Sequence, residues 1–301
     1  MNYLDPKNDL TFKKVFGQHP HLLKSFLNAI LPLPEGSFIE ILEYLPAELA
    51  PENPLSKYSI VDVRCKDNRG RQFIVEMQMH WTTGFMQRVL FNASKAYVRQ
   101  LDRSFKFESL QPVYAVSLLN ENFQPAKQEY YHHYQIVNIE DTGQQIEGLE
   151  FVFIELPKFK ARNITEKKLQ VLWLRFLTEI DESITDAPAD LLECSEITEA
   201  LENLKTSAFS KAELEAYDKY WDSVRVELTL QAEYYNKGLA EGIEEGELLK
   251  AYKTTITGFA LQISFDDLSE LTELPLPTLE KLNQLYAIYG EDTVNHLDEL
   301  N

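Results

Sequence analysis

The sequence predicts an α/β fold followed by an acidic, helical C-terminal extension. Two observations carry this prediction. Along residues 8–119, apolar side chains recur in the order helix, strand, strand, strand, helix, strand, which is typical of α/β proteins. From residue 165 onward, apolar residues keep helical spacing and acidic residues become frequent.

Length and composition limit the class of protein. The chain has 301 residues, of which 44% are apolar, enough for one large domain or two ordinary ones. It has no apolar run near the roughly 18 residues that a membrane-spanning helix needs, and its first residues are too polar for a signal peptide. We therefore expect a cytoplasmic protein. Cys65 and Cys194 are too few for a disulfide framework and are expected to be buried thiols.

The charge is unevenly distributed along the chain. A net charge of −19 argues against a nucleic acid partner, because Lys and Arg contacts to phosphates supply most of the affinity for DNA. Residues 1–110, however, hold 14 basic and 12 acidic side chains, whereas the remainder holds 15 basic and 36 acidic ones. The N-terminal part is thus compatible with a polyanionic substrate.

Two short helices are expected at the N-terminus. Apolar residues at 12, 15 and 16, and again at 22, 23, 26, 27 and 30, follow helical spacing on either side of a His-Pro break. Asp9 lies at the start of the first helix, where it either caps or complements the helix dipole or belongs to a functional site. Five prolines between residues 31 and 54 predict irregular structure around a short strand at 38–44.

A β-hairpin is expected within residues 56–80. Residues 58–65 and 71–79 both alternate apolar and polar side chains, as half-buried strands do, and the polar sequence DNRGR joins them. Because only glycine takes the left-handed conformation without a steric penalty, Gly70 predicts a three-residue loop.

This loop determines how the two strands pair. Asp67 would pair with Arg71. Counting back from this pair along both strands in step places Asp62 opposite Glu76. Asp62, Glu76 and Gln78 are therefore expected on one face of the sheet, and Val61, Val63, Val75 and Met77 on the other. Two carboxylates that lie close together repel each other unless a cation lies between them, and a divalent cation with oxygen ligands meets this need.

A helix is expected directly after the hairpin. Residues 84–103 place apolar side chains near one helical face and Gln87, Arg88 and Lys95 elsewhere. Because this helix follows the strand that carries Glu76, these polar side chains either reach the carboxylates or form a solvated basic face.

The segments 112–119 and 128–159 predict further strands. The first is a nearly continuous apolar run, typical of a strand buried on both faces, and the second is rich in β-branched and aromatic residues. His132 and His133 are adjacent and point to opposite faces of a strand, so we expect surface or structural roles for them rather than shared metal binding.

The rest of the chain is expected to be helical, with one long helix after residue 210 and two short helices around a proline break near the C-terminus. Gly238, Gly242 and Gly246 line one face of the long helix, and each costs about 1 kcal/mol of helix propensity relative to alanine. A close contact with another helix, such as one from a second copy of the chain, would offset this cost. A flexible stretch of helix is the alternative.

Several segments resemble a known family. An aspartate, thirteen residues, and then E-x-Q on a hairpin is the form of the PD-(D/E)xK nuclease core, with Gln78 where that pattern usually has lysine. The segments NDLTFKKVF, DVRCKD and IVEMQ, the pair Gln87-Arg88 with Tyr97, and ELPKF resemble the Rpn family of recombination-promoting nucleases, also described as PD-(D/E)xK family transposases. The resemblance covers about residues 5–250.

This resemblance implies a restriction-endonuclease-like core, with a mixed central sheet flanked by helices, and a metal-dependent DNA endonuclease. Asp62 and Glu76 would bind Mg²⁺ with the Met77 backbone carbonyl, and Mn²⁺ or Ca²⁺ are alternative ions. Gln78 would orient the attacking water or contact the phosphate without the charge of lysine, although the family itself carries glutamine there. Asp9 would add or orient a metal ligand.

The resemblance also implies contacts to DNA through Lys13, Gln87 and Arg88, with solvated charge as the alternative for the two basic residues. We expect a nuclease-like domain over residues 1–160 and a helical extension over 161–301 that serves oligomerisation or regulation. The competing prediction is a catalytically degenerate family member that serves DNA docking or protein assembly.

Overall fold

The computed structural model describes residues 2–49, 59–82, 84–101, 106–161 and 168–300. Contacts between residues divide the chain into two compact units, Met1–Val224 and Arg225–Asn301. The first unit holds a mixed sheet and the helices around it, and the second is helical. The boundary predicted from the sequence between residues 160 and 161 stays a prediction.

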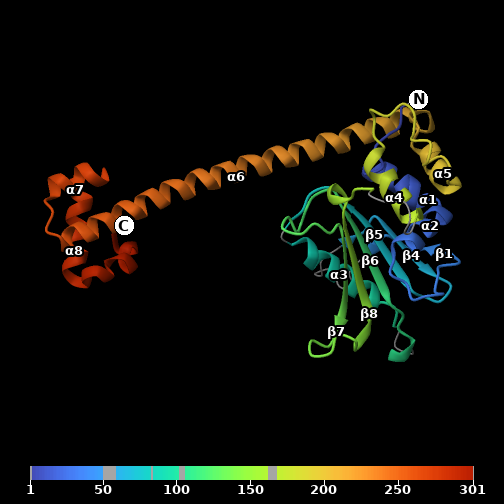
Figure 1. Cartoon of the computed structure of the whole chain (residues 1–301), viewed down its shortest axis with the longest axis horizontal. Coiled ribbons are helices and arrows are strands. Elements are labelled where there is room, and N and C mark those ends of the chain that lie inside the picture. Colours follow the sequence, from blue (N-terminus) through green and yellow to red (C-terminus); the bar gives the residue numbers. More distant parts are fainter. Residues whose placement is uncertain (1, 50–58, 83, 102–105, 162–167, 301) are drawn as a thin grey trace. The chain divides into compact units, whose positions relative to one another are not determined.

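A six-stranded sheet forms the centre of the first unit (Figure 1). Its strands are β1 (Leu42–Tyr44), β4 (Val63–Asp67), β5 (Gln72–Gln78), β6 (Val113–Leu119), β7 (Tyr131–Val137) and β8 (Gln145–Glu155). They lie in the order β1-β4-β5-β6-β8-β7. The β5-β6 and β6-β8 pairs are parallel and the other three are antiparallel, so the sheet is mixed as predicted. Two short strands, β2 (Glu48–Leu49) and β3 (Ser59–Ile60), pair with each other in a separate sheet.

Helices cover both faces of this sheet (Figure 1). One face packs against α1 (Asp9–Gln18), α2 (Pro20–Ile30), α4 (Lys168–Glu179) and α5 (Ser195–Leu204). The other face packs against α3 (Phe85–Val98). Three short 3-10 helices complete the unit: η1 (Phe107–Ser109), η2 (Leu156–Lys158) and η3 (Thr206–Ala208).

The larger core is built around aromatic side chains from helices that are far apart in the sequence. The ring of Trp173 in α4 lies 5.4 Å from Phe16 of α1 and 5.8 Å from Phe26 of α2, measured between ring centroids. The Trp173 indole N–H also donates to the Ser25 hydroxyl at 3.2 Å. Helix α4 therefore belongs to the same hydrophobic core as the N-terminal helices.

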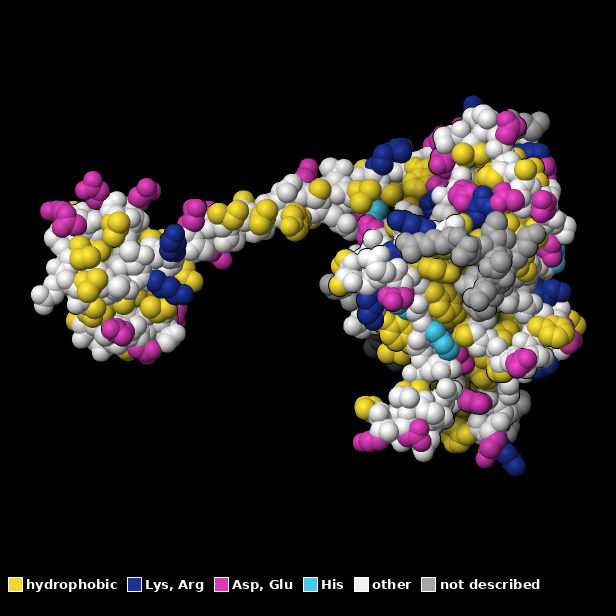
Figure 2. All heavy atoms as spheres, in the orientation of Figure 1, with side chains coloured by type: hydrophobic (Ala, Val, Ile, Leu, Met, Phe, Trp, Pro, Cys, Tyr) yellow, Lys and Arg dark blue, Asp and Glu magenta, His cyan; other side chains and the backbone are white. Residues whose placement is uncertain are grey.

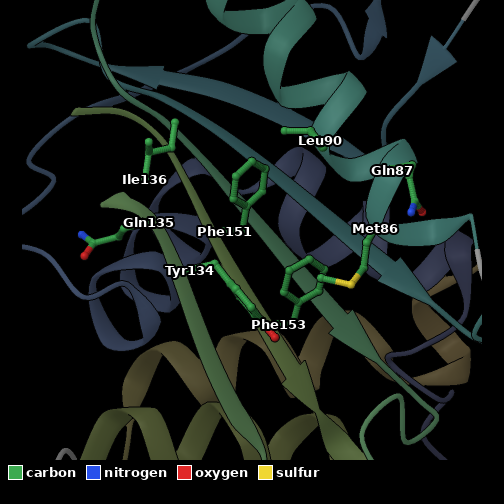
Figure 3. A pocket seen from close by; sticks show the side chains of 8 residues that line it. All are labelled: Met86, Gln87, Leu90, Tyr134, Gln135, Ile136, Phe151 and Phe153. Atoms are coloured by element: carbon green, nitrogen blue, oxygen red, sulfur yellow. The ribbon is translucent and has the colours of Figure 1, made fainter. Parts of the chain in front are cut away.

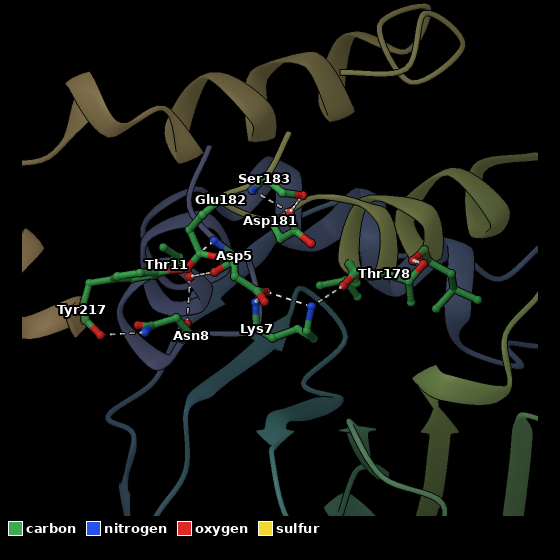
Figure 4. Close-up of polar contacts among 11 residues, drawn as sticks. Asp5, Lys7, Asn8, Thr11, Thr178, Asp181, Glu182, Ser183 and Tyr217 are labelled. Atoms are coloured by element: carbon green, nitrogen blue, oxygen red, sulfur yellow. Dashed lines mark hydrogen bonds and ion pairs between the residues drawn. The ribbon is translucent and has the colours of Figure 1, made fainter. Parts of the chain in front are cut away.

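A polar network joins the N-terminal segment to later parts of the same unit (Figure 4). Lys7 forms an ion pair with Asp5 at 2.9 Å and donates to a backbone carbonyl in α4 at 3.3 Å. The Tyr217 hydroxyl accepts from the Asp5 N–H at 2.9 Å and contacts the Glu182 carboxylate. These bonds hold the start of α1 in place, and the predicted site residue Asp9 is the first residue of this helix.

Helix α6 (Lys211–Ala260) begins in the first unit and ends in the second. In the second unit, its last turns pack with α7 (Phe265–Thr272), α8 (Leu276–Tyr289) and the 3-10 segment η4 (Gly290–Leu300). Gly258 is required here by close packing, because a Cβ atom at this position would lie 2.3 Å from the Leu268 side chain.

Most predicted elements are present in the structure. The N-terminal helices, the helix after the hairpin, the strands in 112–159 and the two short C-terminal helices are confirmed. All seven residues of β6 are buried, as a strand covered on both faces requires. Residues 56–58 of the predicted hairpin and 102 and 103 of the predicted helix lie outside the described residues. In the part of the chain that the structure describes, no helix is both long enough and apolar enough to cross a membrane.

Candidate active site

The turn between β4 and β5 has the predicted pairing. The Asp67 N–H donates to the Arg71 carbonyl at 3.0 Å, and Gly70 adopts a φ of +85°, the left-handed conformation expected of it. The Asp67 carboxylate accepts from Arg71 Nε at 2.7 Å, which stabilises the loop. The ladder that follows pairs Val63 with Val75.

The first strand of the hairpin is interrupted at Asp62, which lies in a bend just before β4. Val63 is buried on the α1 side of the sheet and Val61 on the α3 side, so the prediction that the two valines share a face is wrong. The reason is that the Val61 N–H donates to the Ala47 carbonyl at 3.1 Å instead of continuing the ladder. The bend directs the Asp62 carboxylate onto β5, where it accepts from the Met77 N–H at 2.7 Å.

Glu76 lies on the α3 face of β5 and is 7% exposed. Its carboxylate accepts from the Asn92 side-chain N–H of α3 at 3.0 Å. Burial raises the pKa of Glu76, and the nearby charge of Asp62 raises it further, while the Asn92 hydrogen bond and the Arg88 charge lower it. Each carboxylate is thus held where its charge is poorly solvated.

The Asp62 carboxyl shows the same effect. Burial raises the pKa of Asp62 to about 6, and the charge of Asp9 adds to this rise. The Met77 N–H and the charges of Lys13 and Arg88 act in the opposite direction. Asp9, Lys13 and Arg88 therefore all lie close enough to act electrostatically on Asp62.

Gln78 and Arg88 are joined at the end of β5. Arg88 Nη2 donates to the Gln78 side-chain oxygen at 2.5 Å, and the Gln78 amide N–H donates to the His80 carbonyl at 2.5 Å. The Arg88 guanidinium also lies 4.9 Å from the centroid of the Phe85 ring. Gln78 therefore positions a cation beside the carboxylates, although it carries no charge itself.

Asp9 and Lys13 approach the same region from α1. They form an ion pair at 2.7 Å, and both side chains are 43% exposed. The capping hydrogen bond of α1 comes from the neighbouring Asn8, whose side-chain oxygen accepts from the Leu10 N–H at 3.0 Å. Asp9 is therefore not the capping residue, and its carboxylate lies in the first turn beside the candidate site.

Three other predicted polar residues lie elsewhere. Gln87 lines a groove between α3, β7 and β8 instead of facing the carboxylates. His132 bonds to the buried Glu155 carboxylate at 2.7 Å, and His133 bonds to Glu150 at 2.8 Å, which agrees with structural roles for both.

Asn92 belongs to the site but was not predicted from the sequence. It is 1% exposed and lies among the buried residues Val89, Ala93 and Ala96 of α3. A polar residue at a buried helical position needs a partner, because an unpaired buried amide is costly. This position within the apolar spacing of α3 was the signal that could have identified it.

The donor atoms at the site suit an ion that prefers oxygen. Within the described ranges, no three His, Cys, Asp or Glu side chains form a group that could hold a metal ion. Asp62 and Glu76 therefore offer two acidic ligands. Mg²⁺ is commonly bound by one or two protein carboxylates and takes water and substrate phosphate for the rest of its shell, so the pair fits such an ion. Burial is the main cause of the raised pKa of both groups, and the nearby charge of Asp9 on Asp62 and of Asp62 on Glu76 adds to it.

Comparison with known families adds one finding. The family model described as "PD-(D/E)XK nuclease family transposase" matches residues 6–226. The matched segment contains the whole six-stranded sheet, helices α1 to α5 and the Asp62-Glu76 pair. No curated protein and no solved structure matches the chain.

Proposed function

Because the chain belongs to the PD-(D/E)XK nuclease family transposases, whose name indicates a nuclease-like or transposase-related function, we propose that it is a Mg²⁺-dependent endodeoxyribonuclease. The reaction is hydrolysis of a phosphodiester bond in DNA. The observation that carries the proposal is the pair of partly desolvated carboxylates, Asp62 and Glu76, beside the Arg88 guanidinium. PD-(D/E)XK nucleases generally use divalent metal ions, and this pair has the ligand chemistry that such an ion requires.

In this proposal, Asp62, Glu76 and the Met77 carbonyl hold the ion, with Mg²⁺ as the expected metal and Mn²⁺ or Ca²⁺ as alternatives. The bound ion would lower the pKa of a coordinated water and stabilise charge on the scissile phosphate. Asn92 keeps the Glu76 carboxylate oriented through its hydrogen bond. Asp9 stands near Asp62, where it orients a ligand or adds one.

Arg88 would supply the positive charge that the general PD-(D/E)xK pattern usually takes from lysine. Its guanidinium can donate several hydrogen bonds to a phosphate, and the Gln78 amide oxygen orients it. Lys13 would contact the DNA backbone from α1, and Gln87 would contact the strand next to the scissile bond. We place this activity in the cytoplasm and, by family resemblance, in recombination or the movement of mobile elements.

The test is cleavage of supercoiled plasmid DNA by the purified full chain. Asp62→Asn and Glu76→Gln remove one negative charge each and retain the side-chain shape, so each is expected to reduce Mg²⁺-dependent nicking by at least about 100-fold. EDTA should abolish nicking by the unmodified chain.

Glu43→Gln is the matched control. Glu43 of β1 forms an ion pair with Lys66 of β4 and is outside the site, so its replacement should leave nicking unchanged. Equal nicking by the unmodified chain and by both site variants would refute the proposal.

Assembly is a second function, favoured by one face of α6. Residues 225–250 are exposed throughout, and Figure 2 shows hydrophobic side chains along this segment. Val226, Leu230 and Leu248 lie on one helical face, and Leu228, Tyr235, Leu239 and Ile243 recur on the opposite face. The three glycines Gly238, Gly242 and Gly246 lie on this same face, and a Cβ atom on any of them would meet nothing within 4 Å. We propose that two copies of the chain pair through this face, a role that a catalytically degenerate member would retain.

A further inference from the structure

Two neighbouring pockets lie at the edge of the sheet where β5, β6 and β8 end. The first, of about 450 Å³, is lined by Asn120 after β6 and by Pro157 and Lys160 after β8. Lys7 and Thr178, which Figure 4 shows near each other, line it from the helical side. The second pocket, of about 380 Å³, shares Pro157 and Lys160 with the first. The two pockets therefore adjoin, and together we call them the edge groove.

The edge groove begins beside the strand that carries the candidate site. Strand β5 ends at Gln78, and the Asn120 N–H donates to the Gln78 carbonyl at 2.9 Å. From there the groove passes the ends of β6 and β8 and reaches Tyr130, directly before β7. Because neighbouring strands lie about 4.8 Å apart, the second pocket, at the end of β8, lies about 10 Å from Gln78.

The second pocket is basic. Lys127, Lys158 and Lys160 line it, and none of its described lining residues is acidic. Lys127 and Lys160 are exposed, and neither ammonium group forms an ion pair with a described residue. The groove that Gln87 lines differs, because none of its described residues is charged (Figure 3). The second pocket therefore suits an anion, and lysine is a common ligand of phosphate.

Buried groups hold Lys158 in place. Its ammonium donates to the Glu155 carboxylate at 2.7 Å and to the Gln124 carbonyl at 2.6 Å. The fully buried Glu155 carboxylate also accepts from the Gln124 N–H at 3.1 Å and bonds to His132 at 2.7 Å. These bonds fix the walls of the second pocket to the end of β8. Because Glu155 offsets the charge of Lys158, the net positive charge comes from Lys127 and Lys160.

The charges of the first pocket are balanced, apart from the shared Lys160. Lys7 forms an ion pair with Asp5 at 2.9 Å. Glu179 accepts two hydrogen bonds from Arg175, at 2.7 and 2.8 Å. Lys127 and Lys160 are therefore the cations that an anion in the edge groove would meet without displacing another partner.

We propose that the edge groove binds the sugar-phosphate backbone of the DNA strand that is cut, with Lys127 and Lys160 contacting phosphates on one side of the scissile bond. The inference rests on the proposed function and adds to it the path of the DNA across the protein. At a rise of about 3.4 Å per nucleotide, these contacts lie about three nucleotides from the cut. Lysine contacts to phosphates position DNA without reading its sequence, so the edge groove adds affinity without base preference.

Two features favour DNA over a small free anion. The basic pocket is one end of a longer groove that starts beside Gln78, as a chain of phosphates requires. Free phosphate is commonly held by backbone N–H groups at helix N-termini and in turns. In the edge groove, the positive charges belong instead to long, exposed side chains.

The experiment measures how DNA binding depends on salt. The full chain carrying Glu76→Gln, which keeps the DNA intact, is titrated in Mg²⁺ against a labelled duplex by fluorescence anisotropy at several salt concentrations. Each lysine contact to a phosphate contributes about 0.9 to the slope of log affinity against log salt concentration. Adding Lys127→Gln and Lys160→Gln is therefore expected to lower this slope by about 2 and to weaken binding at about 0.1 M salt at least about 10-fold.

The matched control adds Lys66→Gln and Lys106→Gln to the same chain and so removes the same charge. Lys66 pairs with Gln72, the first residue of β5, and Lys106 lies shortly before the start of β6. Both lysines are thus at the opposite end of the sheet from the edge groove, and their replacement should leave the slope nearly unchanged. Circular dichroism checks that each variant is folded.

A slope that is the same with and without Lys127 and Lys160, or no DNA binding at all, would overturn the proposal. Calorimetric titration with inorganic phosphate is the second measurement. Phosphate binding that depends on these two lysines, together with an unchanged slope for DNA, would assign the pocket to a free anion and reject the DNA path.

The plasmid assay separates this proposal from the nuclease function. Cleavage by the unmodified chain, together with a slope that does not depend on Lys127 and Lys160, would uphold the nuclease and reject the edge groove. A slope that falls as expected, without any cleavage by the unmodified chain, would uphold the edge groove as a DNA-binding surface and reject hydrolysis.

Discussion

At the scale of single residues, the candidate site depends on carboxylates whose charge is poorly solvated. The Asp62 carboxylate accepts from the Met77 N–H, and Glu76 accepts a hydrogen bond from Asn92. Neither contact offsets the burial of the charged form, so both pKa values are raised. A bound cation would remove this penalty, which links metal binding to stability.

A dependence of stability on pH follows from Asp62. Its pKa is raised to about 6 in the folded chain, whereas an unfolded aspartate has a pKa of about 3.9. Between these values the folded state binds more protons than the unfolded state, so stability falls as pH rises through this interval. Without metal, Asp62→Asn should therefore melt at a higher temperature than the unmodified chain above about pH 6, and the difference should vanish below about pH 4.

Thermal melts across this pH range, in EDTA and in Mg²⁺, measure the effect. Mg²⁺ is expected to raise the melting temperature of the unmodified chain at about pH 7 and to leave that of Asp62→Asn nearly unchanged. Glu43→Gln, which alters an exposed carboxyl on β1, should follow the unmodified chain at every pH. A melting temperature of Asp62→Asn that equals that of the unmodified chain above about pH 6 would contradict the burial of this charge.

Gln78 shows what residue types alone leave open. In the sequence it stands where a lysine is usual and lacks the charge. In the structure, the Gln78 side-chain oxygen accepts a hydrogen bond from Arg88, a residue of α3. The Arg88 guanidinium therefore lies beside Gln78. The positive charge is therefore present near Gln78, but it comes from α3 and not from β5.

At the scale of elements, the hairpin of β4 and β5 was predictable and its end was not. The local sequence around Gly70 determines the turn, and the turn determines the pairing from Val63 to Lys66. At Asp62 the chain leaves the ladder, because the residues before it pair with β2 instead. This competing pairing comes from a segment more than ten residues earlier, so counting from the turn could not reveal it.

Helix α6 gives a prediction about assembly. If two copies pair through the face that contains Leu239 and the three glycines, Leu239→Glu places a carboxylate in the interface. It should weaken self-association at least about 10-fold, equivalent to about 1.4 kcal/mol. Light scattering coupled to size-exclusion chromatography, over a range of protein concentrations, measures the change.

Val226→Glu is the matched control for this test. Val226 is 59% exposed and lies on the opposite side of α6 from Tyr235, nine residues further along the chain. Its replacement should leave self-association unchanged. A monomer for the unmodified chain at all concentrations would reject pairing through α6.

At the scale of the whole molecule, the main core combines the two ends of the first unit. Trp173 of α4 packs against Phe16 and Phe26, and the Tyr217 hydroxyl of α6 contacts the backbone of Asp5. The helices that follow residue 160 thus cover apolar surface of the helices before it.

Truncation tests which boundary defines an independent folding unit. A chain ending at Val224 retains the first compact unit and is expected to unfold in one cooperative transition, with a melting temperature close to that of the same unit in the full chain. A chain ending at residue 160 would expose Phe16 and Phe26 by losing Trp173, so it is expected to aggregate. Circular dichroism melts and light scattering report both outcomes, and a monomeric, cooperatively folding 1–160 chain would establish the boundary predicted from the sequence.

The α/β class, most of the elements, the turn at Gly70 and the candidate residues Asp62, Glu76, Gln78 and Arg88 could be predicted from the sequence. These depend on local spacing and turn chemistry, which short stretches of chain contain in full. The contacts between these groups became known from the fold: the bend at Asp62, the Asn92 hydrogen bond to Glu76, the Arg88 hydrogen bond to Gln78 and the position of Gln87 away from the carboxylates. These contacts join different elements, and their geometry follows from how helices pack on the sheet, which no local pattern specifies.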